Sequence, residues 1–377
     1  MLKPAPGVSR LRPYEQGQRA IEGMENPTKL SANESSHGPS PAALAAYREA
    51  VGQINRYPDG SQAELRRAIG EVHGLDPERI VCGNGSDELI LLMARAYLQP
   101  GDDFLISENS FEMVRIHCLA QGGNPVVAPE REWRIDVQAL IDSATEKSRL
   151  CVIANPNNPT GTYMTGQELR RLRSGLPPDC LLVIDGAYAE YVDRKDYDSG
   201  ASLVDAGGNT VMTRTFSKIH GLASLRIGWA YCPPNVVDTV QRIRTPFNTN
   251  GPALVAAAAA IRDTGHVDRA RRHNSAWLLR IADAIAAMGL TMAPSVANFY
   301  LIRFPKESGR SGAGAAAFLI QRGIIPRPAA ANDELLRITV GLDHENEAVL
   351  AALADYMGQE EPAAPVSAAS QPAQGAQ

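Results

Sequence analysis

The stretch CLLVIDGAY, residues 180–188, is a continuous apolar run that ends at Asp185. Such a run indicates a strand buried on both faces, as strands are in parallel sheets. Similar runs stand at RIVCG (79–83), DFLIS (103–107), RLCVIANP (149–156) and NTVMTRTFS (209–217). Helix-like stretches separate most of these runs, so the alternation predicts an α/β fold with a mainly parallel sheet between helices.

The last third of the chain has a different pattern. VDRARRHNSAWLLRIADAIAAMG (267–289) predicts a long helix, and a strand, helix, strand, helix series follows between residues 295 and 358. We therefore expect a second, smaller α+β domain. The expected divisions are 1–40 for an N-terminal arm with part of the small domain, 41–265 for the large domain, 266–358 for the C-terminal small domain and 359–377 for a disordered tail.

Composition narrows the class of protein. The 377 residues carry a net charge of −5 and no long basic run, which argues against nucleic acid or an anionic membrane as the main partner. The five cysteines are scattered and include no CxxC pair, so they indicate free thiols in a reducing cytoplasm and not disulfides or a metal site. The N-terminus has no apolar signal core, and PALVAAAAAI (252–261) is too short to span a bilayer.

Ligands of parallel sheets bind beyond the carboxyl ends of the strands, so the residues after each strand are the candidates for chemistry. CGNGSDELI (82–90) runs from a strand into a helix, where Gly85 and Ser86 present backbone N–H groups suited to an anion such as phosphate. The alternative is an ordinary helix start in which Ser86 is the cap, with Asp87 and Glu88 favouring the helix dipole.

Two further strand ends carry polar residues. NPNNPTG (155–161) contains two X-Pro bonds, either of which could be cis, and Asn158 on this turn can point its amide at a ligand oxygen. A plain Asn/Pro/Gly loop is the alternative. Asp185 is costly in an apolar strand unless it has a partner such as a cationic ring nitrogen, and the hydroxyl of Tyr188 could reach the same ligand. Alternatively, Asp185 caps the next helix.

TRTFSKIHGLASLRIGW (213–229) places Lys218 and Arg226 around a short turn. A lysine near apolar neighbours and another cation loses basicity and becomes a nucleophile, whereas Arg226 can grip a dianion. The alternative is a loop with two solvated cations. Taken together, an anion-binding cup, a buried acid, oxygen-directed donors and an amine are the parts that pyridoxal phosphate requires.

The segments that carry these residues resemble the fold-type-I pyridoxal-phosphate aminotransferases, and most closely the histidinol-phosphate aminotransferases. The resemblance extends from about Pro13 to about Met357. It is carried, in matching order and spacing, by LSANES (30–35), YPDG (57–60), GNGSDE (83–88), NPNNPTG, DGAYAEY (185–191), TFSKIHGLASLRIGW (215–229), PSVANF (294–299) and LRITVG (336–341). It implies a large domain with a mixed, seven-stranded sheet, pyridoxal 5'-phosphate as the cofactor, no metal, and a homodimer.

The resemblance also implies roles for single residues. Lys218 resembles the lysine that links covalently to the cofactor and then moves the proton, and Asp185 resembles the partner of the ring nitrogen. Asn158 and Tyr188 resemble the pair that contacts the phenolic oxygen of the ring. The family's phosphate cup matches Gly85, Ser86, Ser217 and Arg226, with Asp87 among the cofactor-binding residues.

Other positions resemble residues around the ring and the substrate. Phe111 stands where the family has an aromatic side chain stacked on the ring, and Tyr57 resembles a tyrosine that reaches the phosphate of the neighbouring subunit. Arg337 resembles the arginine that clamps the α-carboxylate of the amino donor. The substrate pocket of the family matches Tyr14, Asn33 and Arg327, and an arginine such as Arg327 suits a phosphate-bearing substrate.

Three features depart from the family pattern. Gly186 replaces the usual Glu or Ala, which we expect to loosen the turn after Asp185. His37 stands where an apolar residue is commoner and indicates a local change of packing. The segment 328–334 lacks the usual aromatic and glycine pattern. It borders the substrate pocket, so we expect it to affect specificity and not the transamination machinery.

The implied activity is a ping-pong transamination between histidinol phosphate or imidazole acetol phosphate and glutamate or 2-oxoglutarate, a step of histidine biosynthesis. An aromatic amino-acid aminotransferase acting on phenylalanine or tyrosine is the nearest alternative, and a threonine-phosphate decarboxylase is a weaker one. A non-catalytic pyridoxal-phosphate sensor is the alternative from another class. Such regulators carry a DNA-binding module, and we expect too little chain before the first shared motif to hold one.

Overall fold

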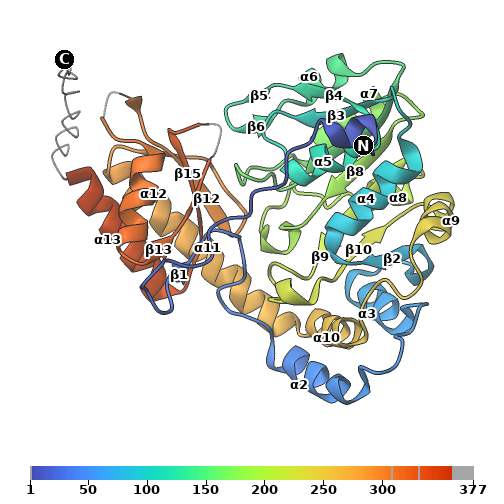
Figure 1. The fold of residues 1–377 in the computed structure, drawn as a ribbon, viewed down its shortest axis with the longest axis horizontal. Helices are drawn as coiled ribbons and strands as arrows, with labels where there is room; N and C mark the ends of the chain where they lie inside the picture. Colours follow the sequence, from blue (N-terminus) through green and yellow to red (C-terminus); the bar gives the residue numbers. More distant parts are fainter. Residues whose placement is uncertain (1, 307–308, 330–331, 359–377) are drawn as a thin grey trace, which may run out of the picture.

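The computed structural model describes residues 2–306, 309–329 and 332–358. Its larger part is built on a seven-stranded sheet (Figure 1). The strands lie in the order β2 (Ile80–Gly83), β10 (Gly228–Tyr231), β9 (Thr210–Thr215), β8 (Leu181–Asp185), β7 (Ser148–Ala154), β3 (Asp103–Ser107) and β4 (Asn124–Ala128). β10 is antiparallel to both of its neighbours, and all the other pairs are parallel. The predicted α/β fold with a mixed, seven-stranded sheet is confirmed.

Helices cover both faces of this sheet because successive strand residues point to opposite sides. On one face, Leu181 and Val183 of β8 pack with α4 (Gly85–Tyr97), α5 (Glu112–Ala120) and α9 (Pro234–Ile243). On the other face, Leu182 and Ile184 pack with α6 (Val137–Ser143), α7 (Gly166–Gly175) and α8 (Ala201–Asp205). The same face is continued over β2 and β10 by α2 (Pro41–Ala50), α3 (Ala63–His73) and α10 (Gly251–Arg262).

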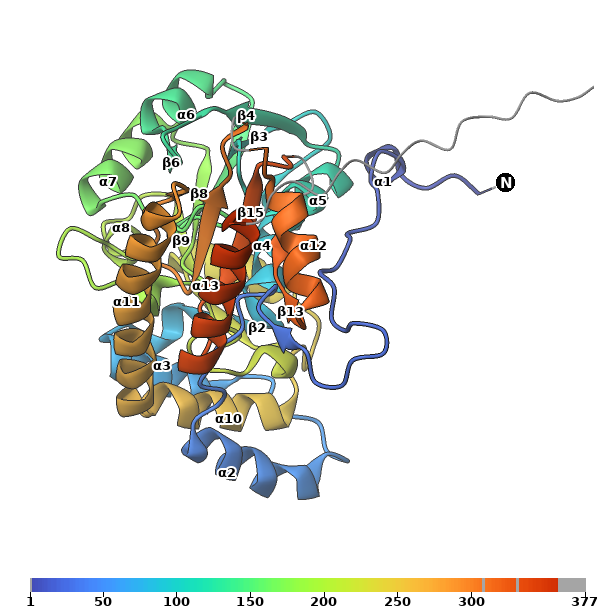
Figure 2. The ribbon, with the colours of Figure 1, turned by 90° about the vertical axis from the view of Figure 1, so that its left-hand side faces the viewer.

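A smaller sheet occupies the other end of the molecule (Figure 1). Its antiparallel strands lie in the order β11 (Thr291–Met292), β12 (Phe299–Arg303), β15 (Leu335–Thr339) and β14 (Arg327–Pro328). α11 (Thr264–Ala287) leads from the large part to this sheet, and Figure 2 shows α12 (Gly312–Gln321) and α13 (Asp343–Gly358) side by side over β15. The domain divisions stay predictions, and the expected tail 359–377 lies outside the described residues.

Short elements connect these layers. β1 (Thr28–Lys29) of the N-terminal segment pairs in parallel with β13 (Ile324–Ile325), so the residues just after it lie between the two sheets. The remaining elements are α1 (Pro6–Ser9), β5 (Glu130–Arg131), β6 (Arg134–Ile135) and the 3-10 turns η1 (Val51–Gln53), η2 (Pro77–Arg79), η3 (Ala189–Tyr191) and η4 (Ala223–Leu225).

Two sequence features find ordinary places in this fold. The alanine-rich run 252–261 lies in α10, which packs against α2 and α3. Across the described part of the chain, no helix has both the length and the apolar character that crossing a membrane demands. All five cysteines are free and buried.

Candidate active site

The first turn of α4 meets the end of β10 at very close range. A Cβ atom added to Gly228 would lie 2.5 Å from the backbone nitrogen of Ser86, so only glycine allows this approach. The residue before the helix is Asn84, whose side chain makes no capping hydrogen bond, and Ser86 lies inside the first turn. The alternative in which Ser86 is the helix cap is therefore wrong. The first-turn N–H groups have no partner within the helix and form a positive helix end.

Ser217 and Arg226 stand beside this helix end. The Arg226 guanidinium donates through Nη1 to Ser217 Oγ at 3.1 Å. A Cβ on Gly85, whose φ is +78°, would lie 2.7 Å from Arg226 Nη2. Among the described residues, Arg226 forms no ion pair with a carboxylate. The guanidinium, a hydroxyl and free N–H groups thus form a cup for an anion.

Asp185 ends β8 in the middle of the sheet and is buried, with 7% of its surface exposed. Thr213 of β9 donates to Asp185 Oδ1 at 3.1 Å. Burial raises the pKa of Asp185 to about 6, against the lowering effect of the Thr213 hydrogen bond, and the carboxylate of Asp87 adds to the rise. Asp87 is itself held by His117 Nε2 at 3.0 Å. A nearby cation would therefore stabilise the ionised carboxylate of Asp185. Asp185 does not cap a helix, so that alternative is not supported.

Lys218 points its amine at the segment that follows β1. Its Nζ donates to Ala32 O at 3.0 Å and lies 5.5 Å from the centre of the Tyr188 ring. Burial lowers the pKa of Lys218 to about 8, the charges of Arg337 and Arg226 add to this, and the carboxylates of Glu34 and Asp185 oppose it. Lys218 is thus enclosed among the candidate residues and is not a solvated surface cation.

Tyr188 is fixed by groups from three segments. Asn33 donates through Nδ2 to the Tyr188 hydroxyl at 3.0 Å, and Phe299 packs edge-on against the Tyr188 ring at 5.0 Å. Asn33 has φ +56°, and it is anchored by Thr339, whose hydroxyl accepts from the Asn33 backbone N–H at 3.0 Å. Asn298 Nδ2 donates to Asn33 O at 3.1 Å. The small sheet therefore holds the residue that orients Tyr188.

Two arginines lie directly opposite each other on β14 and β15. Arg327 and Arg337 are register partners, although like charges in such positions repel. Arg337 donates to Asn158 Oδ1 at 2.6 Å and to Ser31 O at 2.8 Å, while its buried Nε donates to no described group. Arg327 donates to Glu15 O at 3.1 Å. Burial lowers the pKa of Arg337, and the charge of Arg327 adds to this.

Asn158 lies on the NPNNPTG turn, which brings its side chain next to Arg337. Both of its X-Pro bonds, Asn155-Pro156 and Asn158-Pro159, are cis. The Asn158 oxygen is taken by Arg337, so its amide nitrogen remains available to a ligand. The plain-loop alternative does not account for this link between the large sheet and β15.

Comparison with known proteins shows which family the chain belongs to. The model of the family "Aminotransferase class I and II" matches residues 25–353. The chain belongs to this aminotransferase family. The histidinol-phosphate aminotransferases of Rhodopseudomonas palustris and Paramagnetospirillum magneticum are 49% and 48% identical to it over 360 and 357 residues, covering 94% of this chain and 98% of each relative.

A solved relative has the same architecture as this aminotransferase. The crystal structure of the histidinol-phosphate aminotransferase of Sinorhizobium meliloti in complex with pyridoxal-5'-phosphate matches with a TM-score of 0.83 and 28% identity, over 93% of this chain and 96% of that one. The fold-type-I aminotransferase prediction and the prediction of pyridoxal 5'-phosphate as the cofactor are confirmed.

The donor set of this aminotransferase fits that cofactor. The cup at Gly85, Ser217 and Arg226 offers cationic and N–H donors to a phosphate, and the space over Gly85 would be filled by any Cβ. The buried acid Asp185 lacks a cationic hydrogen-bond partner among the described residues. Lys218 is an amine whose pKa responds to both features, since Arg226 lowers it and Asp185 raises it against the larger lowering effect of burial. The individual binding roles of these residues stay predictions.

Three further predicted residues lie at the surface or at the edge of the core. Phe111 precedes α5 and packs at the edge of the core under α4. Tyr57 is 83% exposed and stacks on Phe247 at 4.8 Å. Tyr14 is 43% exposed, and it lies close enough to Arg337 to oppose, slightly, the lowering of that residue's pKa by burial.

Several residues that hold the site carry no recognisable signal in the sequence. Thr213 contacts Asp185, His117 contacts Asp87, and Phe299 packs on Tyr188. Single Thr, His or Phe residues in apolar runs do not indicate such roles. The buried ion pair between Arg214 Nη1 and Glu190 Oε1, at 2.8 Å, was not predicted either. A Cβ at Gly186 would lie 3.2 Å from Arg214 Nε, so this glycine leaves room for the ion pair.

Proposed function

We propose that the chain is a histidinol-phosphate aminotransferase. It passes the amino group of glutamate to imidazole acetol phosphate, giving 2-oxoglutarate and histidinol phosphate, by a ping-pong mechanism in histidine biosynthesis. The identity of 49% to a histidinol-phosphate aminotransferase over 360 residues supports the substrate. The five free, buried cysteines fit our assignment of this reaction to the cytoplasm.

The observation that carries the proposal is the pair Arg327 and Arg337. They face each other across β14 and β15, and neither has a carboxylate partner among the described residues. Arg337 donates to Ser31 O and Lys218 donates to the next carbonyl, Ala32 O, so the two cations contact neighbouring residues. Two adjacent guanidinium groups suit the two anions that alternate here, the carboxylate of glutamate and the phosphate of histidinol phosphate.

Pyridoxal phosphate, when bound, supplies an aldehyde that accepts the amino group and a ring that delocalises negative charge. The chain supplies the rest. Lys218 Nζ takes the proton from the α-carbon of the amino donor and holds it for the second proton transfer. This task suits an amine with a pKa of about 8. Asp185 keeps the ring nitrogen protonated because a buried carboxylate gains most from a cationic partner.

The remaining predicted residues would hold the cofactor and the substrate. Asn158 and Tyr188 would donate to the phenolic oxygen of the ring, and Asn33 fixes the Tyr188 hydroxyl. Ser86, Ser217 and Arg226 would hold the phosphate, and Phe111 would supply an aromatic face to the ring. Tyr14 borders the pocket for the substrate phosphate next to Arg327, whose guanidinium donates to the adjacent Glu15 carbonyl.

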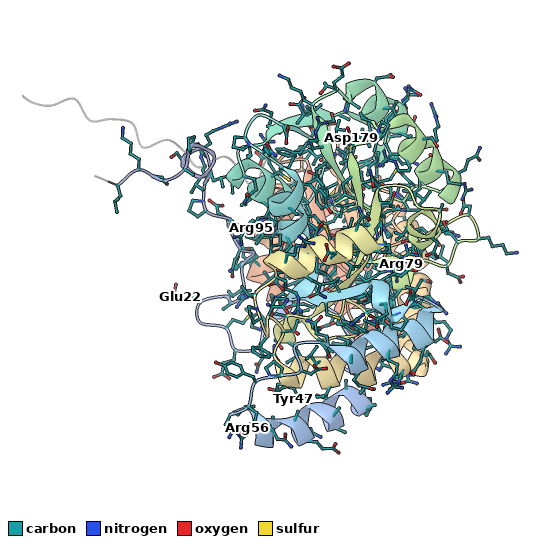
Figure 3. The ribbon with its side chains drawn as sticks, turned by 90° about the vertical axis from the view of Figure 1, so that its right-hand side faces the viewer. Glu22, Tyr47, Arg56, Arg79, Arg95 and Asp179 are labelled. Atoms are coloured by element: carbon teal, nitrogen blue, oxygen red, sulfur yellow. The ribbon has the colours of Figure 1, made fainter. Side chains whose placement is uncertain are left out.

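A homodimer completes the proposal. Figure 3 shows Tyr47 and Arg56 along the outer edge of α2 and η1. The large apolar side chains exposed on this edge and on the adjacent loop and α10 are Leu44, Val51, Ile54, Tyr57, Phe247 and Val255. Apolar groups gathered in this way mark an interface. We propose that a second copy covers them and receives Tyr57 at its phosphate cup.

The substrate assignment is tested by steady-state kinetics of the purified enzyme with 2-oxoglutarate as acceptor. We expect kcat/KM for histidinol phosphate to exceed that for phenylalanine by at least about a hundredfold, since phenylalanine has no phosphate group to pair with the Arg327 guanidinium. Arg327→Leu should lower kcat/KM for histidinol phosphate by about a hundredfold and leave that for phenylalanine within about threefold.

Other outcomes have defined meanings. A higher kcat/KM for phenylalanine would assign an aromatic aminotransferase. Release of carbon dioxide from threonine phosphate without 2-oxoglutarate would assign a decarboxylase, and the absence of any turnover with bound cofactor would favour a sensor.

A further inference from the structure

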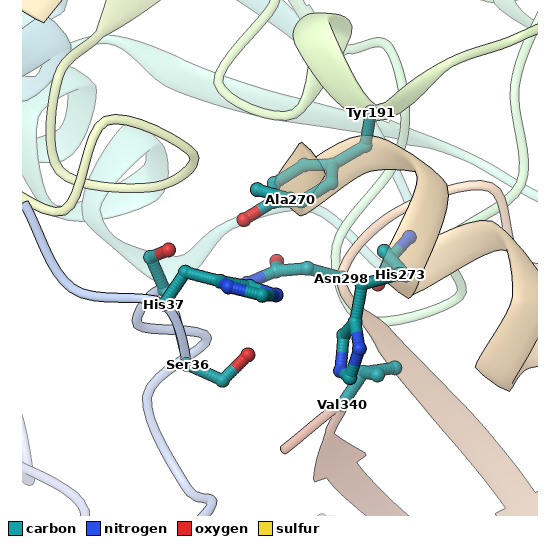
Figure 4. A pocket seen from close by; sticks show the side chains of 9 residues that line it. Ser36, His37, Tyr191, Ala270, His273, Asn298 and Val340 are labelled. Carbon is teal, nitrogen blue, oxygen red and sulfur yellow. The ribbon is translucent and has the colours of Figure 1, made fainter. Parts of the chain in front are cut away.

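A small cavity lies between the N-terminal segment, α11 and the loop before β12. Its volume is about 10 Å³, and the polar residues that line it are Ser35, Ser36, His37, Tyr191, His273, Asn274 and Asn298. Figure 4 shows the Tyr191 hydroxyl, Asn298 and the two histidines around it. A site for one water molecule needs about 10–15 Å³ of this kind of space, so larger ligands are excluded.

Two amide oxygens in this cavity accept no hydrogen bond from the described protein. Asn274 donates through Nδ2 to Ala297 O at 3.0 Å, and Asn298 donates through Nδ2 to Asn33 O at 3.1 Å. These bonds fix which way each amide points. Asn274 Oδ1 and Asn298 Oδ1 are buried without a described donor, and so is Ser35 Oγ. Both asparagines are only 3% exposed, and buried acceptors of this kind are costly unless something donates to them.

The cavity also offers hydrogen-bond donors. Ser35 and Tyr191 each carry a hydroxyl, and burial raises the pKa of Tyr191 against the lowering effect of the nearby Ser35 and Asn298 side chains, so its proton stays in place. His273 is committed elsewhere, since its Nε2 donates to Gly341 O at 2.8 Å. His37 closes the rim, with its ring edge-on to His273 at 4.7 Å. Two acceptors and two hydroxyl donors match a water molecule, which donates twice and accepts twice.

A metal cation fits this site poorly. No carboxylate lines the cavity, so an ion would be surrounded by neutral groups and histidines. Partial burial lowers the pKa of His37, the nearby His273, His266 and Arg269 add to this, and Asp343 opposes it. Removing a cation from water into such surroundings is unfavourable.

We propose that this cavity binds one ordered water molecule, donating to Asn274 and Asn298 and accepting from Ser35 and Tyr191, and that Asn274 and Ser35 are positioning residues. The water joins the segment after Asn33 to α11 and to η3. Asn33 in turn donates to the Tyr188 hydroxyl, so the water contributes to the orientation of Tyr188. This second step rests on the role proposed above for Tyr188, whereas the water site does not.

The water site is tested by a crystal structure of the holoenzyme at about 1.5 Å resolution. We expect a density peak at about 2.6–3.2 Å from Asn274 Oδ1, Asn298 Oδ1 and Ser35 Oγ. Absence of a peak there overturns the proposal. An anomalous peak after a thallium(I) soak also overturns it, because it would identify a cation site.

Variants test the positioning step. Ser35→Ala removes the hydroxyl beside Tyr191, Asn274→Ala removes one acceptor together with the hydrogen bond to Ala297 O, and Ser35→Thr keeps the hydroxyl. We expect Ser35→Ala and Asn274→Ala to shift the pH midpoint of the cofactor absorbance and to lower kcat/KM about fivefold, the effect of one hydrogen bond. Ser35→Thr should restore both properties.

Ser275→Ala is the matched control, because Ser275 lies next to Asn274 on α11 but does not line the cavity. It should behave like the wild type. If Ser35→Ala and Asn274→Ala also leave the absorbance midpoint and kcat/KM unchanged while the density peak is present, the water is real but the positioning step is wrong.

Discussion

Lys218 and Asp185 owe their chemistry to where they are buried. An exposed lysine has a pKa of about 10.4 and is almost wholly protonated at neutral pH. Burial and two guanidinium groups bring the pKa of Lys218 to about 8, so about one amine in ten is neutral at pH 7. Asp185 shifts in the opposite sense because burial disfavours its negative charge. A bound ring with a positive nitrogen relieves the cost at Asp185.

The lowered pKa of Lys218 predicts how the rate of cofactor capture by the apoenzyme depends on pH. Only the neutral amine attacks an aldehyde, so the rate of capture should rise almost tenfold per pH unit below about 8 and level off above it. Stopped-flow absorbance with excess pyridoxal phosphate measures this rate, and Lys218→Ala should show no covalent phase. A rate that keeps rising up to pH 10 would mean that the amine titrates like a solvated lysine.

At the scale of elements, the decisive contact is the one between α4 and β10. The apolar runs of β2, β3, β7, β8 and β9 are visible in the sequence because each is buried on both faces. The strand β10 was not predicted, because no turn residues mark where the preceding loop ends and Gly228–Tyr231 begins. The site residues at strand ends were predictable for the same reason as the strands, but their neighbours were not. Thr213 lies next to Asp185 only because β9 pairs with β8.

A methyl group placed between α4 and β10 should separate them. In Gly228→Ala, the new Cβ would lie 2.5 Å from Ser86 N and 2.6 Å from Gly85 C, and both are backbone atoms that cannot rotate away. Such overpacking costs about 1–3 kcal/mol, and if this cost falls on the cofactor-binding state, cofactor affinity should drop by about fivefold to about 150-fold. Fluorescence titration of the apoenzyme measures the affinity.

The control for this prediction is Gly265→Ala in α11. A Cβ there would meet only ordinary contacts, with Arg269 Nη1 at 3.6 Å, so cofactor affinity should not change. Equal affinities for wild type, Gly228→Ala and Gly265→Ala would show that the α4 helix end does not bind the phosphate.

The whole molecule should lose stability in weak acid through its buried histidines. The ring of His73 lies 5.4 Å from that of Trp229, and burial, with Arg214, lowers the pKa of His73 to about 4. Above pH 6.5 the residue is neutral in both states. As the pH falls from 6.5 toward 4, His73 binds a proton in the unfolded chain but not in the folded chain. Stability should therefore fall by up to about 1.4 kcal/mol per pH unit from this residue.

Urea unfolding at pH 7.5 and pH 5 measures this loss. His73→Gln should reduce the difference between the two pH values, whereas His344→Gln, an exposed residue of α13, should not. If the loss is the same in wild type and His73→Gln, other groups are responsible for the acid sensitivity.

Sharing of sites between two copies can be tested without a structure of the dimer. Tyr57 is 83% exposed and stacks on Phe247, so nothing in its own protomer fully covers it. Lys218→Ala and Tyr57→Ala proteins should each be nearly inactive. When they are unfolded and refolded together, each mixed dimer has one site with an intact lysine and an intact Tyr57 from its partner. Activity should then recover to about a quarter of that of wild type, because half of the dimers are mixed and each has one complete site. Refolding each variant alone is the control, and no recovery in the mixture would place Tyr57 in the site of its own chain or outside any site.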